Sequence, residues 1–338
     1  MATIYDIARH VGVSAGTVSR ALSRPEKVLP ATRVRIEQAA AALGYIPNTV
    51  ARTLKTQRSG KILVTVPDIA NPFFAKILQG AEEAAQAADY AVLLGDTQHQ
   101  PDREERYAQM LRRNEADGLI VLGHRLPPTA CGIVKQLGPH APVVNGCEFD
   151  PALGIPSVHI DNAAAARAAM EHLYDLGHEC IAVVGGPPDN PLHQQRLDGA
   201  KLAAKARGHL RQLTLAPGDF SVESGYAAGM KLLGQGADTA TAAFCFSDQM
   251  ALGVLAACRE LGKSVPHEFS IVGFDDLASS RYLNPPLTTI SQPMREIGIR
   301  AVNLLLAIID GADGARVQHQ QTLDFGLMLR GSTAARPG

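Results

Sequence analysis

The side chains of this chain that could do chemistry follow short apolar runs, at points where strands are expected to end. Acids, amides and one arginine make up this set, which consists of Asp68, Asn145, Asp161, Asn190, Arg196, Asp248 and Asp275. Carboxylates accept paired hydrogen bonds from sugar hydroxyls, and a guanidinium donates a planar fork to polar oxygens. An Asp after a strand is also a common N-cap of the next helix. The pattern therefore predicts a site for a polar ligand, with helix capping as the alternative at each position.

The motifs that would indicate catalysis or nucleotide binding are incomplete or missing in this sequence. Gly185-Gly186 follows an expected strand, but Pro187-Pro188 comes next and no complete Gly-x-Gly-x-x-Gly occurs. The sequence holds no Walker A motif, and its 11 histidines form no His-Glu-x-x-His pair. The 5 cysteines are scattered and lack metal-ligand spacing, which indicates reduced thiols packed as small apolar side chains. We expect a protein that is not an enzyme and that needs no metal or cofactor.

The elements that must position these side chains are short strands that alternate with helices from Lys61 onward. The expected strands are Ile62–Val66, Ala91–Leu94, Gly118–Leu122, Val143–Val144, Val158–Ile160, Ile181–Val184, Gln212–Leu215, Ala243–Phe246 and Ser270–Phe274. The expected helices include Phe73–Ala88, Asp102–Asn114, Asn162–Leu176, Val222–Leu233 and Gln249–Leu261. Such alternation predicts parallel α/β sheets, and because open sheets rarely exceed about ten strands, we expect two lobes that divide near residues 159–162. Ligands of such sheets lie beyond the carboxyl ends of the strands.

The N-terminal residues 3–22 have the pattern of two short helices around a tight turn. Thr3 and Ser14 are candidate N-caps, and Gly12 ends the first helix. The expected inner faces consist of Ile4, Ile7, Ala8, Val11, Val18, Ala21 and Leu22. The expected outer face of the second helix consists of Ala15, Gly16, Thr17, Ser19 and Arg20. A recognition helix offers such a face to the major groove of DNA, and an ordinary helical hairpin is the alternative.

Charge is unevenly distributed along the 338 residues, although the net charge is only −1. Residues 1–60 hold nine Lys and Arg against three Asp and Glu, so this part is basic and the remainder is acidic. A basic module on an acidic body suits a protein that contacts phosphate with one end. The sequence shows neither a basic stretch followed by an N-terminal apolar run nor an apolar segment of about 20 residues, so we expect a soluble cytoplasmic protein without membrane contact.

Four motifs in the N-terminal part resemble the lactose-repressor (LacI) family of bacterial transcription regulators. They are Thr3-Ile4-x-Asp6-Ile7-Ala8, Val11-x-Val13-Ser14, Thr17-Val18-Ser19-Arg20 and Gly44-Tyr45-x-Pro47-Asn48, followed by a hinge segment that ends at Leu54. A third helix is expected from Ala31 to Leu43. The family usually caps this helix with Ser where this chain has Leu29, so we expect a poorly capped helix that Pro30 still helps to start.

The resemblance implies an all-α helix-turn-helix headpiece at 1–46, a hinge helix and linker at 47–60, and an α/β body of two similar parallel-sheet lobes like type-I periplasmic binding proteins. The first lobe would comprise 61–160 and about 291–320, and the second 161–290 and about 321–332. The implied DNA contacts are Thr3, Ser14, Ala15, Gly16, Thr17, Ser19, Arg20, Arg33, Asn48, Ala51, Arg52, Leu54 and Lys55. Arg20 would read guanine or contact phosphate only, and Leu54 would wedge into the minor groove of palindromic operator DNA bound by a homodimer.

The resemblance also implies an effector site between the lobes. Its residues would be Asp68, Phe73, Phe74, Asn145, Asp161, Asn190, Arg196, Phe220, Asp248 and Asp275, with Phe220 stacked on a ring and Phe73 equally well explained as a core residue. Val64-x-Val66-Pro67-Asp68-Ile69 and Pro285-Pro286-Leu287-Thr288-Thr289-Ile290 look like the cytidine-repressor branch. We therefore expect a repressor that a nucleoside such as cytidine releases from DNA. Ribose or another pentose is an alternative effector, a solute-binding protein without DNA function is an alternative class, and a cyclic-AMP-dependent activator is an implied partner.

Overall fold

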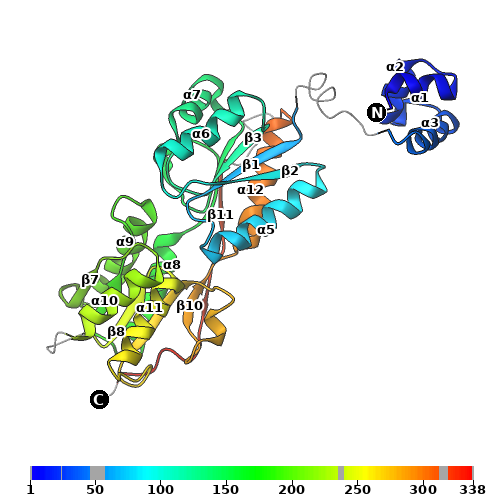
Figure 1. Cartoon of the computed structure of the whole chain (residues 1–338). Helices are drawn as coiled ribbons and strands as arrows, with labels where there is room; N and C mark the ends of the chain where they lie inside the picture. The colour runs from blue at the N-terminus through cyan, green and yellow to red at the C-terminus, as the bar shows by residue number, and fades with distance from the viewer. Residues whose placement is uncertain (1, 24, 46–57, 235–239, 312–318, 337–338) are drawn as a thin grey trace. The chain divides into compact units, whose positions relative to one another are not determined.

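The structure is a computed structural model that describes residues 2–23, 25–45, 58–234, 240–311 and 319–336 (Figure 1). The chain divides into two compact units, Met1–Arg58 and Ser59–Gly338. Among the helices in the described ranges, none is both long and apolar enough to cross a membrane.

The first unit, which we call the headpiece, contains the helices α1 (Ile4–Val11), α2 (Ala15–Ser23) and α3 (Pro30–Ala42), with the 3-10 turn η1 (Pro25–Lys27) between α2 and α3. Ile7, Val18 and Ile36, one from each helix, are fully buried and form the centre of its core. Gly12 ends α1 in the left-handed conformation, at φ 72°, which glycine adopts without strain. The helix-turn-helix pattern is thus folded as the sequence predicts.

Two expectations for α2 need correction. Leu22, predicted for the inner face, is 36% exposed and does not join the core. Ala15, predicted for the outer face, is half-buried and packs against the core. Both residues lie near the edge of the apolar stripe, where the helical period alone does not decide which side a residue takes.

The first lobe of the second unit is built on a six-stranded parallel sheet, in the order β11-β5-β4-β3-β1-β2. Its strands are β1 (Lys61–Val66), β2 (Ala91–Asp96), β3 (Gly118–Val121), β4 (Val143–Gly146), β5 (Ser157–Ile160) and β11 (Gln320–Leu323). Helices α5 (Pro72–Ala87) and α12 (Met294–Ile309) cover one face, and α6 (Pro101–Arg112) and α7 (Pro128–Leu137) cover the other. The short turns η2 (Gly138–His140) and η3 (Pro151–Leu153) connect elements of this lobe.

The second lobe repeats this plan with a sheet in the order β12-β10-β9-β8-β6-β7, parallel except for β12. Its strands are β6 (Ile181–Val184), β7 (Leu213–Ala216), β8 (Ala242–Cys245), β9 (Ser270–Asp275), β10 (Thr288–Ser291) and β12 (Gly326–Met328). Its helices are α8 (Asn162–Asp175), α9 (Pro191–Ala206), α10 (Val222–Gly234) and α11 (Asp248–Glu260), with the turns η4 (Leu210–Gln212) and η5 (Ser280–Tyr282). Gly225 and Gly253 let α10 and α11 approach closely, since a Cβ on Gly253 would lie 2.1 Å from the Val222 carbonyl oxygen.

The chain passes between the two lobes three times, after β5, after β10 and after β11 (Figure 1). Because β11 pairs with β5 of the first sheet, the last passage follows Leu323, slightly later than the position near residue 320 that the sequence suggests. The carboxyl ends of the strands in both lobes carry the residues that line the cavity described next.

Candidate effector cleft and DNA-binding headpiece

A cavity of about 280 Å³ is lined by residues from both lobes. The first lobe contributes Pro67, Asp68, Ala70, Asn71, Phe73, Phe74, His99 and Glu148. The second lobe contributes Leu192, Arg196, Asp219, Phe220, Ser221, Val222, Glu223, Ser247, Gln249 and Asp275. Most of these residues follow a strand or begin a helix, as expected for a ligand site at the carboxyl ends of parallel strands. We call this cavity the cleft.

Arg196 is the cation inside the cleft, and its position is fixed by contacts on three sides. Its side chain comes from α9 and is only 3% exposed. Nε donates to Asn162 Oδ1 at 2.9 Å, Nη1 donates to the carbonyl of Phe246, and Cζ lies 3.7 Å above the centre of the Phe274 ring. Among the described residues, Nη2 of Arg196 has no hydrogen-bond partner, so this nitrogen is available to a bound molecule. Burial lowers the pKa of Arg196 to about 10, and Asp275 and Glu148 oppose this effect.

Asp275 lies at the end of β9 in an unusual backbone conformation. Its φ is 121° and that of Asp276 is 57°, so two consecutive residues with side chains occupy the left-handed region. Such residues cost about 1–3 kcal/mol each and persist where their surroundings hold them. Gln292 Nε2 donates to Asp275 Oδ1 at 2.8 Å, and the Arg330 guanidinium binds Asp276 at 2.5 Å. Burial raises the pKa of Asp275 to about 8, although the charge of Arg196 opposes this shift.

Glu148 is a buried carboxylate that links the two lobes. It follows β4 in the first lobe, and its Oε2 lies 2.9 Å from His124 Nδ1. The amide Nδ2 of Asn190, at the start of α9 in the second lobe, donates to the same oxygen at 3.3 Å. A second contact between the lobes runs from Gln195 Nε2 to the carbonyl of Phe149 at 2.9 Å. A ligand in the cleft therefore lies beside the groups that hold the lobes together.

Three phenylalanines supply the apolar walls of the cleft. Phe220 has φ 69°, and its ring covers Gly186, where a Cβ would lie 2.2 Å from the ring. Phe73 and Phe74 form an edge-to-face pair with centroids 5.3 Å apart. Both are buried in the first-lobe core and also line the cleft. Phe73 is thus a core residue as one interpretation predicts, and its contact with an effector stays a prediction. Aromatic faces of this kind can cover the apolar side of a ligand ring.

Six of the ten residues that the sequence proposes for the effector site line the cleft, namely Asp68, Phe73, Phe74, Arg196, Phe220 and Asp275. The remaining four do not line it. Asp161 caps α8 through Ala164 N, and Asn190 caps α9 through Leu192 N. Asn145 donates to the carbonyls of Val121 and Gly123. At these positions, the polar residue after a strand caps the next helix or donates hydrogen bonds to carbonyls near the ends of the strands.

Asp248 is the fourth of these residues, and its carboxylate is fully engaged inside the second lobe. It accepts from Leu277 N at 2.8 Å and from the hydroxyls of Ser280 and Thr289 at 2.5 Å each. Burial raises its pKa to about 6, and the two hydroxyl hydrogen bonds oppose this shift. These contacts hold the segment that follows β9, and in this way Asp248 supports the backbone turn at Asp275.

Several lining residues were not proposed from the sequence. They are His99, Glu148, Leu192, Asp219, Ser221, Val222, Glu223, Ser247 and Gln249, together with the backbone segments around Pro67 and Asn71. Glu148 and Ser247 follow strands, which is a signal that singles them out for inspection. His99 and Glu223 carry no such signal, because the loop after β2 and the first turn of α10 reach the cleft only through the tertiary fold.

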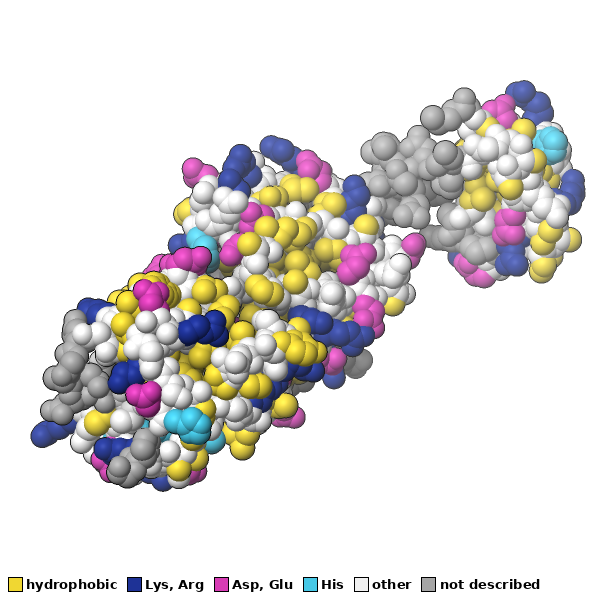
Figure 2. All heavy atoms as spheres, turned by 60° about the horizontal axis from the view of Figure 1, so that its bottom comes forward, with side chains coloured by type: hydrophobic (Ala, Val, Ile, Leu, Met, Phe, Trp, Pro, Cys, Tyr) yellow, Lys and Arg dark blue, Asp and Glu magenta, His cyan; other side chains and the backbone are white. Residues whose placement is uncertain are grey.

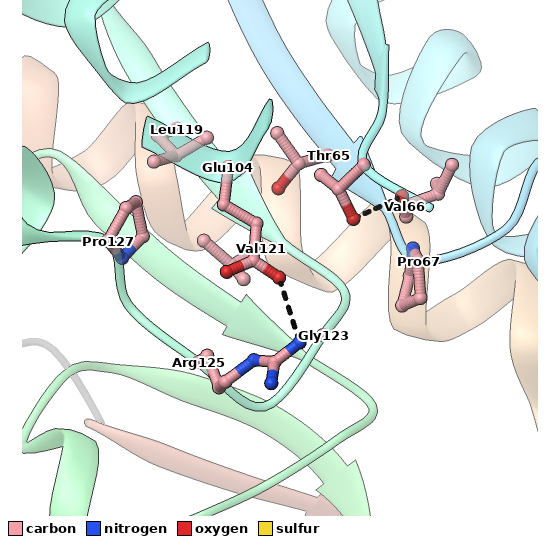
Figure 3. A pocket seen from close by; sticks show the side chains of 10 residues that line it. Thr65, Val66, Pro67, Glu104, Leu119, Val121, Gly123, Arg125 and Pro127 are labelled. Carbon is pink, nitrogen blue, oxygen red and sulfur yellow. Dashed lines mark hydrogen bonds and ion pairs between the residues drawn. The ribbon is translucent and has the colours of Figure 1, made fainter. Parts of the chain in front are cut away.

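A smaller pocket of about 20 Å³ lies beside the cleft, at the ends of β1 and β3 (Figure 3). Glu104 and Arg125 form its ion pair at 3.5 Å, drawn as a dashed line in Figure 3. Arg125 Nη2 also donates to the carbonyl of His99 at 3.0 Å, where Gln98 and His99 are both left-handed. The pocket has room for about one water molecule. The hydrogen bond from Arg125 thus ties this pocket to the loop that carries His99.

The proposed DNA-contacting residues of the headpiece lie at the ends and outer faces of its helices. Thr3 and Asp6 form a capping box at the start of α1, and Ser14 caps α2 by accepting from Thr17 N at 3.1 Å. Arg20 is exposed, and its Nε donates to the carbonyl of Gly16 at 3.3 Å. Ser19 is half-buried, and Arg33 faces Glu37 at 3.5 Å. The hinge helix and its residues Asn48, Ala51, Arg52, Leu54 and Lys55 lie outside the described residues.

Basic and acidic side chains are both visible on the headpiece and on the face of the second unit in Figure 2. Leu29 precedes α3 without a side-chain cap, as the sequence predicts, and α3 still forms with Pro30 in its first turn. Arg35 Nη2 donates to the carbonyl of Val11 at 2.6 Å and so ties α3 to the end of α1. The exposed side chain of Arg20 on α2 is one that could contact DNA phosphate or a base edge.

Comparison with known proteins agrees with this architecture. Residues 3–48 match the bacterial regulatory proteins of the lacI family, and residues 170–333 match the periplasmic binding protein-like domain. The HTH-type transcriptional repressor CytR of Escherichia coli (strain K12) is 42% identical over 99% of this chain and 97% of its own length. The crystal structure of the lac repressor dimer bound to operator and the anti-inducer ONPF has a TM-score of 0.88 at 30% identity, over 99% of both chains.

A LacI family transcriptional regulator from Enterococcus faecium with bound ribose has a TM-score of 0.73 at 29% identity, over 81% of this chain and 99% of its own. The chain therefore belongs to the lacI family of bacterial regulatory proteins. Within that family it is a DNA-binding transcriptional repressor with a helix-turn-helix headpiece and an effector-binding body, and not an enzyme. The headpiece match excludes a solute-binding protein without DNA function.

Proposed function

We propose that a nucleoside such as cytidine binds in the cleft and releases this repressor from its operator. The observation that carries the proposal is that the lining of the cleft combines charged side chains with an aromatic ring. Arg196 and Asp275 line the cavity with a guanidinium and a carboxyl group, and Phe220 lines it with an aromatic ring. Ribose hydroxyls suit the guanidinium and carboxyl groups, and a base suits the aromatic face. The resemblance of Val64–Ile69 and Pro285–Ile290 to the cytidine-repressor branch supports the same ligand class.

Release from DNA requires that the ligand bind one arrangement of the lobes better than the other. The hydrogen bond between Glu148 and Asn190 and the lining residues of both lobes support such a difference, because a ligand in the cleft contacts both lobes at once. The coupling between effector and operator would then be worth about 1–3 kcal/mol. We propose induction, so that effector weakens operator binding.

On the DNA side, we propose that two copies of the chain bind a palindromic operator in the cytoplasm. Arg20 would read guanine. The DNA backbone or groove would be contacted by Thr3, Ser14, Gly16, Thr17, Ser19 and Arg33. Ala15 would fit closely against the DNA. Among the hinge residues, Leu54 would wedge into the minor groove and Arg52 would contact phosphate, and Asn48, Ala51 and Lys55 are also proposed to contact DNA. A cyclic-AMP-dependent activator is proposed as a further partner from the family resemblance alone.

A pentose is the second candidate effector. The Enterococcus faecium relative was crystallised with ribose, and the polar floor formed by Arg196 and Asp275 needs no base to bind sugar hydroxyls. A pentose would leave Phe220 without a base to stack on.

Calorimetric titration of the full chain with cytidine, uridine, adenosine, ribose and hypoxanthine tests the proposal. A ligand at 100 times its dissociation constant stabilises the protein by about 2.7 kcal/mol, so a thermal shift checks each titration. Fluorescence anisotropy with operator DNA gives the direction of coupling. Binding of cytidine with weaker operator affinity supports the proposal, whereas binding of ribose alone favours the pentose. An effector that tightens operator binding contradicts induction.

A further inference from the structure

We propose that the cleft selects unphosphorylated effectors, because carboxylates at its opening repel a phosphate ester. The inference rests on the proposed function and deepens it by naming the class of molecule that the site excludes. Asp68 of the first lobe and Asp219 and Glu223 of the second are exposed and line the cleft, so they form its solvent-facing edge. We call these three residues the acidic rim.

Asp219 of the acidic rim is held in its carboxylate form by hydrogen bonds. Burial acts to raise the pKa of Asp219, but hydrogen bonds from Ser221 and Ser224 outweigh it and hold this pKa below its ordinary value. Ser221 Oγ donates to Asp219 Oδ1 at 2.5 Å, and Ser221 N donates to the same oxygen at 2.9 Å. These contacts stabilise the carboxylate form. A phosphate that enters the cleft therefore meets the Asp219 carboxylate, and the acidic side chains of Asp68 and Glu223 line the same cavity.

The one arginine of the cleft lining does not offset this charge. Two of the three guanidinium nitrogens of Arg196 are already engaged, by Asn162 and by the Phe246 carbonyl. Glu148 and Asp275 surround the same guanidinium and act on its pKa. Nη2 can donate to a neutral oxygen, but it cannot supply the paired, uncompensated donors that bind phosphate well. The floor of the cleft thus suits hydroxyl groups.

The helix N-termini at the cleft are also poorly suited to phosphate. Helices α5, α9, α10 and α11 all begin beside lining residues, and free N–H groups at such ends commonly bind anions. Each end already has a side-chain acceptor on one of its N–H groups, supplied by Asn71, Asn190, Ser221 and Ser247. In α5 and α9, proline stands at the first position and removes another donor. Each of these four helix ends therefore offers fewer free N–H donors to a phosphate.

The test compares matched ligands by calorimetric titration of the full chain. The pairs are cytidine with cytidine 5′-monophosphate and ribose with ribose 5-phosphate, and 5′-O-acetylcytidine serves as a bulky but neutral ligand. We expect the phosphate ester to bind at least about tenfold more weakly than its parent, and the acetyl ester to bind closer to the parent. Raising the salt concentration should narrow the difference for the phosphate ester, because the acidic rim is exposed.

The variant Glu223→Gln isolates the rim, because it removes one exposed carboxylate that lines the cleft and that is not among the residues proposed to bind effector. We expect this variant to gain affinity for the phosphate ester while its affinity for the parent changes little. Glu82→Gln, an exposed acid on α5 that does not line the cleft, is the control and should leave the ratio unchanged.

The outcomes separate this inference from the proposed function. Repulsion by the rim is wrong if the phosphate ester binds as tightly as its parent. It is also wrong if the acetyl ester loses as much affinity as the phosphate ester does. In both cases the parent still binds, so the nucleoside or pentose proposal stands. An unchanged ratio in Glu223→Gln also overturns the inference. If neither parent binds, the proposed effector class fails, and preferential binding of either phosphate ester would overturn both.

Discussion

Glu148 of the first lobe and Asn190 of the second are joined across the cleft by a hydrogen bond of 3.3 Å. The same asparagine caps α9 through its other side-chain atom, which accepts from Leu192 N at 2.8 Å. Helix α9 carries Arg196 into the cleft. One side chain thus connects lobe closure to the placement of the arginine that we propose to bind effector.

Asn190→Asp should weaken effector binding by about tenfold, since a carboxylate keeps the cap of α9 but faces Glu148 without a donor. Asn190→Ser also keeps a cap but adds no charge, so this variant should lose less effector affinity. Calorimetric titration measures both variants, and far-UV circular dichroism checks that α9 is retained. Wild-type affinity in both variants would show that this hydrogen bond does not contribute to closure.

Arg196→Lys should reduce effector affinity by about 100-fold, because an ammonium cannot satisfy Asn162, the Phe246 carbonyl and a ligand in the planar arrangement of a guanidinium. Operator affinity without effector should stay near that of the wild type, so the variant would be non-inducible. Arg207→Lys, at the other end of α9 in an exposed pair with Asp175, is the control. Equal losses in both variants would indicate a general effect on α9.

The pH dependence of stability should reveal Asp275. Burial raises its pKa to about 8 in the folded chain, whereas an unfolded Asp has a pKa of about 3.9. Between these values the folded state binds more protons, so the free energy of unfolding decreases as pH rises and levels off above about pH 8. Asp275→Asn should remove this part of the slope. Urea denaturation of both proteins from pH 5.5 to 8.5 measures the difference, and parallel curves would contradict it.

Arg20→Ala should weaken operator binding by about 10- to 100-fold if Arg20 reads guanine, and it should relax preference at one base pair. Arg9→Ala, also exposed and paired loosely with Asp6 at 3.9 Å, removes the same charge from α1. Fluorescence anisotropy with operator and with mismatched duplexes compares the two variants. A uniform loss over all sequences would assign Arg20 to phosphate. Effector binding should not change in either variant.

Leu29→Ser should stabilise the headpiece by about 1 kcal/mol, because Ser supplies the side-chain cap that α3 lacks. Leu29 is 76% exposed, so little packing is lost. Leu29→Ala removes the same side chain without adding a cap and serves as the control. Hydrogen exchange of the α3 amides in the full chain should slow in the Ser variant relative to the Ala variant. Equal exchange would mean that Pro30 already sets the start of the helix.

The order of strands and helices could be predicted because apolar periodicity and turn residues are local signals. The start of α5 shows this well, since Asn71 and Pro72 provide both the cap and the first helical residue. Strands β10, β11 and β12 were not predicted individually. Gln320-Gln321-Thr322 has no apolar alternation, and this segment becomes a strand only because β5 offers it a free edge.

The effector site was predictable only where a residue's role follows from its position after a strand or from the family resemblance. Arg196 and Phe220 reach the cleft as the resemblance implies. Asp248 follows a strand in the same way, yet its partners Leu277, Ser280 and Thr289 come from distant segments. Such long-range contacts decide whether a carboxylate faces ligand or core, and no local pattern encodes them.

The three passages of the chain between the lobes also have a consequence for biosynthesis. The first sheet is completed by β11 at Gln320–Leu323 and the second by β12 at Gly326–Met328. Neither lobe can reach its final strand pairing until almost the whole polypeptide has left the ribosome. The headpiece, whose core uses only residues before position 46, can fold long before then. A nascent chain could therefore carry a finished DNA-binding module while its ligand-sensing half is still incomplete.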